Sequence, residues 1–339
     1  MPSRIHRLPG DVERLLAAGR GLFSVQAAAD AGIDRGRLAR LLRSGLLVRL
    51  AHGTYASLEA YEAMPPWPAF AMRSRAFTAA CGPPAHAAGW SAVAIHELPT
   101  IGPPPDLPSV AVPQGAAASG DFAFGQVRSV LLPADHRIEV DGCPVVSVAR
   151  AVIDVGRTAP RDQALVLADA AIALRTGRDE LRAVLADMYG WPGSAEARWA
   201  VDHADPYCES ALETLGRLTF IEHGLPVPVS NPWIDLGAVR YRADHLLDDR
   251  WLVFEGDGDL KYNDRPDAAH IIRQQREREW RLREEGFEIV RYGWDMARYQ
   301  RAKLSDRFRQ VIADRSPRVR PYPWYRERGV YRRARSSPG

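Results

Sequence analysis

Two acidic residues in the C-terminal third of the chain have the types and spacing of a metal-binding carboxylate pair. Asp244 lies in the segment VRYRADHLLD, and Glu255 follows the apolar run WLVF eleven positions later. If the two segments are antiparallel strands joined by a short turn, these side chains become cross-strand or diagonal neighbours. Two carboxylates at such close range repel each other unless a cation lies between them. Carboxylate oxygens suit Mg²⁺ or Mn²⁺, with waters and a substrate phosphate as further ligands, and such a metal can promote phosphodiester hydrolysis.

The same residues also allow a structural interpretation. Glycine and aspartate are turn formers, so the sequence EGDG that starts at Glu255 can be a solvated turn, and Asp244 can pair with an arginine such as Arg242. A carboxylate that directly follows a buried apolar strand is costly without a partner, which favours the metal hypothesis. Asp257 stands two positions after Glu255, and Lys261 lies four further on, where it can bring a cation toward a phosphate.

The elements that must position these acids begin at residue 207. The pattern predicts a helix, three strands, a helix and a fourth strand, in the order αβββαβ. Glu213 lies in the first helix, and the third strand, RWLVFEGDG, is expected to be central and buried on both faces. The second helix, residues 265–285, carries arginines that we expect mainly to pair with its glutamates.

The N-terminal residues 1–56 predict a helical unit that ends in a hairpin. Ser24 and Asp34 are candidate N-caps, and the segment LLVRLAHGTYA alternates as a short hairpin does. The last helix has an arginine face made of Arg35, Arg37, Arg40 and Arg43. Two short helices joined by a Gly-containing turn and followed by a hairpin form the layout of a winged helix-turn-helix.

Two resemblances fit these patterns. The segment GLFSVQAAADAGIDRGRLARLLRSGLLVRLAHGTYA resembles the N-terminal winged helix of AbiEi-type antitoxins over about 45 residues. This resemblance implies DNA binding, with the arginine face in the major groove and with Arg49 and His52 of the wing at phosphates. The alternative is a winged helix that contacts only protein.

The second resemblance concerns the acids. The segments ESALETLGRLTFIEHGLPVP, VRYRADHLLDDRWLVFEGDGDLKY and REEGFEIVRYGW resemble the DUF559 or very-short-patch-repair-like endonucleases of the PD-(D/E)xK group. The resemblance implies that Asp244 and Glu255 bind the metal, that the Gly256 carbonyl is a further ligand, and that Glu213 completes the site. The wider group has lysine where this chain has Asp257, whereas the DUF559 relatives commonly show a similar E-x-D-G, so the departure is from the wider group and not from the nearer one.

The expected fold class is therefore multidomain α+β. It comprises a winged helix-turn-helix (residues 1–56), an AbiEi-like α/β middle domain (69–186), a restriction-endonuclease-like αβββαβ domain (207–296) and a basic tail (297–339). A Pro-bearing connector is expected at 57–68, and the end of the tail is expected to be disordered on its own.

Charge and composition indicate a nucleic-acid partner. Residues 1–55 hold nine Lys or Arg against four Asp or Glu, and residues 296–339 hold thirteen against three, so both ends are basic. The alternative is arginine-rich solvated ends that reflect a GC-rich genome. The three cysteines form no CxxC pair, and no apolar run suits a signal peptide or membrane span, so a cytoplasmic protein without membrane contact is expected.

Three functional hypotheses follow. The first is a DNA-binding, Mg²⁺-dependent endonuclease with Asp244, Glu255, Asp257, Lys261 and Glu213 as its catalytic set. The second is an AbiEi-type antitoxin or transcriptional regulator, with a possible cognate toxin and an inactive nuclease-like domain. The third is a nuclease directed at RNA. A small-molecule substrate is not expected.

Overall fold

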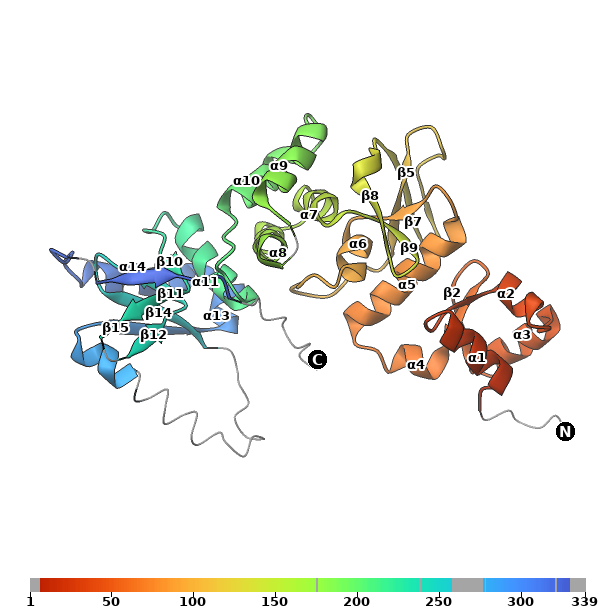
Figure 1. Cartoon of the computed structure of the whole chain (residues 1–339), viewed down its shortest axis with the longest axis horizontal. Coiled ribbons are helices and arrows are strands. Elements are labelled where there is room, and N and C mark those ends of the chain that lie inside the picture. Colours follow the sequence, from red (N-terminus) through yellow and green to blue (C-terminus); the bar gives the residue numbers. More distant parts are fainter. Residues whose placement is uncertain are drawn as a thin grey trace.

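The computed structural model describes residues 7–174, 176–237, 239–257, 277, 279–320 and 322–329. These residues form a mixed α and β structure with several separate sheets. The N-terminal elements lie at one end of the long axis, the helices of residues 148–203 lie near the centre, and the strands of residues 229–293 lie at the other end (Figure 1). Among the described residues, no helix combines the length and apolarity needed to cross a bilayer.

The N-terminal unit packs three helices against a small antiparallel sheet of order β1-β3-β2. The Ser24 hydroxyl accepts a hydrogen bond from the Ala27 N–H, and the Asp34 carboxylate accepts one from the Arg37 N–H, which confirms both predicted N-caps. The elements are α1 (Gly10–Ala18), β1 (Phe23–Ser24), α2 (Val25–Asp30), α3 (Arg35–Arg43), β2 (Leu47–Ala51) and β3 (Thr54–Ser57).

The β2–β3 hairpin packs on the region that follows it. Leu50 of β2 shares a hydrophobic cluster with Phe77 of the next long helix. The predicted connector of residues 57–68 is largely helical, because α4 (Leu58–Glu62) and the start of α5 (Pro66–Cys81) occupy it. The Pro-bearing connector predicted here thus contains helix, and the hairpin is part of a core that joins the first two regions.

The middle region is a six-stranded mixed sheet of order β6-β7-β5-β4-β9-β8, followed by helices. Its strands are β4 (His86–Ala87), β5 (Ser109–Pro113), β6 (Gly120–Phe122), β7 (Gly125–Val130), β8 (Arg137–Val140) and β9 (Cys143–Val146). Its helices are α6 (Trp90–Ile95), the 3₁₀ turn η1 (Ala134–His136), α7 (Val148–Gly156), α8 (Arg161–Leu174), α9 (Arg178–Asp187) and α10 (Ser194–His203).

The C-terminal region contains two sheets. The first has the order β10-β13-β14-β15, with β14 antiparallel to β13 and parallel to β15, and the second has the order β12-β11-β16. Leu252, Val253 and Phe254 of β14 are all 0% exposed, which confirms the predicted central strand. The elements are α11 (Ala211–Glu222), β10 (Val229–Ser230), β11 (Pro232–Asp235), β12 (Arg240–Arg242), β13 (His245–Leu247), β14 (Leu252–Asp257), β15 (Glu288–Gly293), α13 (Trp294–Tyr299), α14 (Arg301–Ala313) and β16 (Trp324–Arg326).

The predicted basic tail of residues 297–339 is folded over most of its described part. Phe308 of α14 is fully buried, and its ring centroid lies 4.6 Å from that of Phe220 and 4.8 Å from that of Phe254. Further along, β16 pairs with β11 in antiparallel register. The tail prediction was therefore wrong here, because apolar residues spaced among the basic ones complete the core.

Gly216 of α11 lies against Tyr292 of the sheet. A Cβ atom at this position would lie 2.0 Å from the Tyr292 hydroxyl oxygen and 2.4 Å from Cζ of that ring. Since Tyr292 is only 2% exposed, its ring has no free space to move into. We expect Gly216→Ala to lower the free energy of unfolding by roughly 1–3 kcal/mol in urea titrations.

The matched control is Gly177→Ala, where an added Cβ meets nothing within 4 Å. The double variant Gly216→Ala with Tyr292→Val should recover part of the loss, since the smaller side chain removes the clash. Equal stabilities of Gly216→Ala and the wild type would contradict this packing.

Candidate functional site

Asp244 and Glu255 lie side by side on neighbouring strands. The β13–β14 register pairs His245 with Phe254, and one further step places Asp244 opposite Glu255. Asp244 Oδ2 accepts a hydrogen bond from the Gly256 N–H at 2.8 Å, and Glu255 Oε1 lies 3.4 Å from the donor Asp244 N. Both acidic residues are only half-buried. The structure therefore brings the predicted pair together.

The second predicted strand is broken at Asp244, and this break places Asp244 opposite Glu255. The chain leaves one sheet after Arg242 and enters the other at His245, so Asp244 stands between β12 and β13. Asn231 stands at the matching break between β10 and β11, has a φ of 48°, and donates its N–H to the Asp244 carbonyl at 2.8 Å. Asparagine tolerates this left-handed backbone better than most residues.

Burial and mutual repulsion raise the pKa values of the acidic cluster. Burial, followed by the charge of Asp244, raises the pKa of Glu255 well above its ordinary value. The same two causes raise the pKa of Glu213 to about 7. Asp244 thus faces two carboxyl groups whose simultaneous ionisation is unfavourable without a cation.

The pair fits a hard divalent cation. The Tyr241 hydroxyl and the Asp244 N–H both donate to Oε1 of Glu255, which leaves Oε2 as the oxygen that could bind a metal. The donors are oxygens, which Mg²⁺ and Mn²⁺ prefer. Backbone oxygen, water or phosphate would supply further ligands beside the carboxylates of the described residues.

Glu213 lies near Asp244 and also takes part in helix capping, while its role at a metal stays a prediction. Its carboxylate accepts hydrogen bonds from the Glu209 N–H at 2.7 Å, from the Ser210 hydroxyl at 2.8 Å and from the Asn231 side-chain amide. Ser210 in turn caps α11 through the Glu213 N–H. This arrangement is a variant of the capping box, so Glu213 holds the start of α11 against the strand break.

Asp257 lies on the same face of β14 as Glu255 and pairs with a cation that the sequence analysis missed. Its carboxylate lies 3.1 Å from a guanidinium nitrogen of Arg291, and Arg291 is the register partner of Glu255 across the parallel β14–β15 pair. Arg291 thus places a positive charge beside Asp257 and Glu255. Lys261 and most of the predicted helix 265–285 lie outside the described residues.

Two further buried residues, His245 and Tyr292, contact the acidic cluster and were not predicted. His245 is 0% exposed, and its Nε2 lies 3.1 Å from both the Glu213 carbonyl and the Tyr292 hydroxyl. Burial lowers the pKa of His245 to about 3, so this ring is neutral at pH 7. Its only sequence signal was a histidine directly after Asp244 in an otherwise apolar strand.

Another polar cluster lies far along the chain from these acids. Asp135, His136 and Asp187 are the only described residues that place three potential metal ligands within 4.8 Å of one another. Arg150 Nη1 lies 3.2 Å from His136 Nδ1, and Asp187 lies 3.2 Å from Nε2. Since arginine can only donate, Nδ1 must accept and Nε2–H must donate to Asp187. Both ring nitrogens are therefore used, and the cluster does not suit a metal.

The predicted DNA-contact residues divide into two groups. Arg35, Arg40 and Arg43 are exposed on α3. Arg37 instead donates two hydrogen bonds to Asp11, at 2.5 and 2.8 Å, and thereby ties α3 to α1.

In the hairpin, Arg49 donates to His52 Nδ1 at 3.0 Å, and its Cζ lies 5.2 Å from the centroid of Phe124 in the middle region. The β2–β3 hairpin is thus partly turned toward the middle sheet, while the α3 arginines remain accessible.

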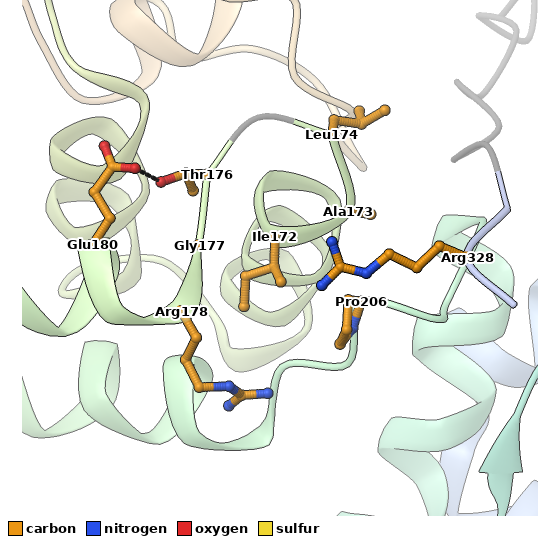
Figure 2. Close-up of a pocket in the computed structure, with 9 residues that line it drawn as sticks. All are labelled: Ile172, Ala173, Leu174, Thr176, Gly177, Arg178, Glu180, Pro206 and Arg328. Carbon is orange, nitrogen blue, oxygen red and sulfur yellow. Dashed lines mark hydrogen bonds between the residues drawn. The ribbon is translucent and has the colours of Figure 1, made fainter. Parts of the chain in front are cut away.

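A separate open pocket of about 470 Å³ lies where α8, α9 and the C-terminal segment meet (Figure 2). Arg328 extends toward Ala173 from one side, while Arg178 donates to backbone carbonyls, including that of Asp202 at 3.1 Å. None of the site residues predicted from the sequence lines this pocket.

Residues 11–57 match the family model described as "Transcriptional regulator, AbiEi antitoxin". Two uncharacterized proteins from two strains of Mycobacterium tuberculosis are 31% identical to the chain over 171 residues. The matched part is 50% of this chain and 61% of each relative, so the chain spans about three fifths of the length of these relatives. The AbiEi resemblance of the N-terminal segment is thus confirmed over residues 11–57.

The raised pKa of Glu213 predicts a specific pH dependence of stability. Glu213 binds its proton more tightly in the folded protein, where its pKa is about 7, than in the unfolded chain, where it is 4.5. The resulting stabilisation is complete below pH 4.5 and is lost as the pH rises through 7. Glutamine does not titrate, so the free energy of unfolding of Glu213→Gln, relative to the wild type, should rise over this range by on the order of 3 kcal/mol.

Urea titrations at a series of pH values measure this difference. The control is Glu196→Gln, because the hydrogen bond from Arg161 lowers the pKa of Glu196, and the difference should then slope in the opposite direction. A pH-independent difference for Glu213→Gln would contradict the expected proton binding.

Proposed function

We propose that this protein binds duplex DNA through residues 11–57 and hydrolyses DNA phosphodiester bonds at a divalent-cation site held by Asp244 and Glu255. The observation that carries the hydrolytic part is the pairing of these two carboxylates on adjacent strands, where each faces the other's charge. The family match over residues 11–57 supports the DNA-binding part.

The topology around the acids also supports hydrolysis. Helix α11 precedes the antiparallel strands β10, β13 and β14 of one sheet, and β15 joins β14 in parallel. We take this arrangement as support for a restriction-endonuclease-like core. In such a site, a bound Mg²⁺ would activate water and offset the charge that develops on the phosphate.

The chain's own residues would hold this site in place. The Tyr241 hydroxyl fixes one oxygen of Glu255, and the Gly256 N–H fixes one oxygen of Asp244. Arg291 anchors Asp257 and brings a permanent positive charge close to Glu255, where it would attract a phosphate.

A second candidate is an antitoxin-type transcriptional regulator whose nuclease-like domain does not catalyse. The family description of residues 11–57 favours it, and so do the engagement of Glu213 in helix capping and the pairing of Asp257 with Arg291. Incubation of the purified protein with Mg²⁺ or Mn²⁺ and a panel of DNA substrates separates the two candidates. Intact substrates together with a gel shift of the protein's own promoter would favour the regulator, with a cognate toxin as its possible partner.

The DNA-binding part predicts a defined salt dependence. Each arginine that neutralises a phosphate contributes about one to the slope of log affinity against log salt concentration. The triple variant Arg35→Ala, Arg40→Ala, Arg43→Ala should therefore bind duplex DNA more weakly, with the slope reduced by about two to three. Fluorescence anisotropy at several salt concentrations measures this slope. The control is Arg182→Ala on α9, which is expected to keep the wild-type slope, and an unchanged slope in the triple variant would remove α3 from the interface.

A further inference from the structure

The small sheet next to the acids has one face outside the hydrophobic clusters. In the register of β12, β11 and β16, Trp233 lies between Arg242 and Tyr325, so these three residues share one face. Side chains of the next row, Ile234 and its partners, point to the opposite face and pack in a core cluster. The outer row therefore exposes part of two aromatic rings instead of filling a core.

Arginines cover the rings of this face. Arg242 Cζ lies 5.5 Å from the ring centroid of Trp233, and Arg240 Cζ lies 5.7 Å from that of Tyr325. Trp233 and Tyr325 are half-buried, whereas Arg240 is exposed. Within the described part of the chain, Arg240 has no carboxylate within ion-pair distance, so its charge is open to an outside anion.

This face leads directly to the acidic pair. Arg242 belongs to β12 and stands two positions before Asp244. Its guanidinium also donates to Glu209, whose N–H donates to Glu213, so the face and the acidic cluster share one hydrogen-bonded network. A ligand on the sheet would therefore be adjacent to the proposed reaction centre.

We propose that this face, defined by Trp233, Tyr325, Arg240 and Arg242, binds an unpaired DNA strand and guides it to Asp244 and Glu255. Aromatic rings that a sheet leaves partly exposed stack on single bases, and a neighbouring arginine whose charge is open, here Arg240, pairs with a phosphate. The bases of a duplex are already stacked on each other and do not offer their faces to such rings. The choice of DNA rests on the proposed function, whereas the preference for a single strand rests on the rings.

The test uses the full-length protein and fluorescence anisotropy with a labelled oligothymidine in EDTA, so that cleavage plays no part. Trp233→Ala and Tyr325→Ala should each weaken single-strand binding roughly tenfold, which is the range expected for loss of one base stack. Trp233→Phe and Tyr325→Phe keep a ring and should stay near the wild-type affinity. Arg240→Gln, at an exposed position, should weaken binding and flatten its salt dependence even if an alanine variant fails to fold.

The control is Tyr189→Ala, an 84% exposed aromatic residue far along the chain from this sheet, which should bind as the wild type does. Unchanged single-strand affinity of Trp233→Ala, Tyr325→Ala and Arg240→Gln would overturn the proposal, and tighter binding of the matching RNA would overturn the assignment to DNA. Because the assay contains no metal, an inactive nuclease site would leave its result unchanged.

Discussion

Asp244→Asn is expected to reduce metal-dependent DNA cleavage strongly and to remove the stabilisation of the protein by Mg²⁺. Asparagine keeps an oxygen that can accept the Gly256 N–H but removes the charge that a cation needs. Metal stabilisation of the transition state amounts to several kcal/mol, so cleavage should fall by roughly 100- to 1000-fold. Gel assays of DNA cleavage measure the first effect, and thermal unfolding with and without Mg²⁺ measures the second.

In EDTA the same variant should unfold at the same temperature as the wild type or at a higher one. Its neutral amide no longer repels Glu255 and Glu213, whose pKa values the Asp244 charge raises. Asp249→Asn is the matched control, because it makes the same chemical change in the turn at the other end of the β13–β14 hairpin, on a side chain that is 55% exposed. Cleavage that survives in Asp244→Asn would exclude the carboxylate pair as the metal site. Duplex binding that survives while cleavage is lost would separate the two proposed activities.

Arg217→Met is expected to cause the largest loss of stability. Arg217 on α11 lies 3.0 Å from both oxygens of Asp169 on α8, and the two side chains are 5% and 0% exposed. Asp169 also accepts bonds from the Asp205 N–H and the Thr214 hydroxyl, both at 2.7 Å. Methionine would leave a buried carboxylate without its counter-charge, which costs roughly 3–5 kcal/mol.

Urea unfolding followed by circular dichroism measures this loss. The double variant Arg217→Met with Asp169→Leu should recover much of it, because an apolar pair of similar volume can replace a buried ion pair at little net cost. The control Arg182→Met removes an exposed ion pair with Asp179 and should change stability by less than about 1 kcal/mol. If Arg217→Met also changed the free energy of unfolding by less than about 1 kcal/mol, the packing of α8 on α11 would not depend on this contact.

The parts of the site that follow from short-range patterns were predictable from the sequence. The apolar run before Glu255 identified a strand that is buried on both faces, and the short separation of Asp244 from it indicated a cross-strand pair. Ser24 and Asp34 revealed helix starts because a capping side chain bonds only three residues ahead. In each case, the interaction lies within one strand pair or one helical turn.

Other features depended on residues that are distant in sequence. Arg291 reaches Asp257 only because β15 joins β14 in parallel after a long crossover, and no local pattern pairs those residues. The basic character of residues 297–339 concealed the buried face of α14, since Phe308 finds its partners on α11 and β14. The arginine face of α3 likewise concealed that Arg37 is paired with Asp11.

The sequence by itself determined the acidic pair, the strand that carries Glu255 and the AbiEi-like character of residues 11–57. The tertiary structure decided that Glu213 caps a helix, that Asp257 forms an ion pair with Arg291 and that the C-terminal segment completes a core. The physical reason is that a side chain's type fixes which partners it can accept, whereas burial and strand pairing decide which of these partners comes within bonding distance.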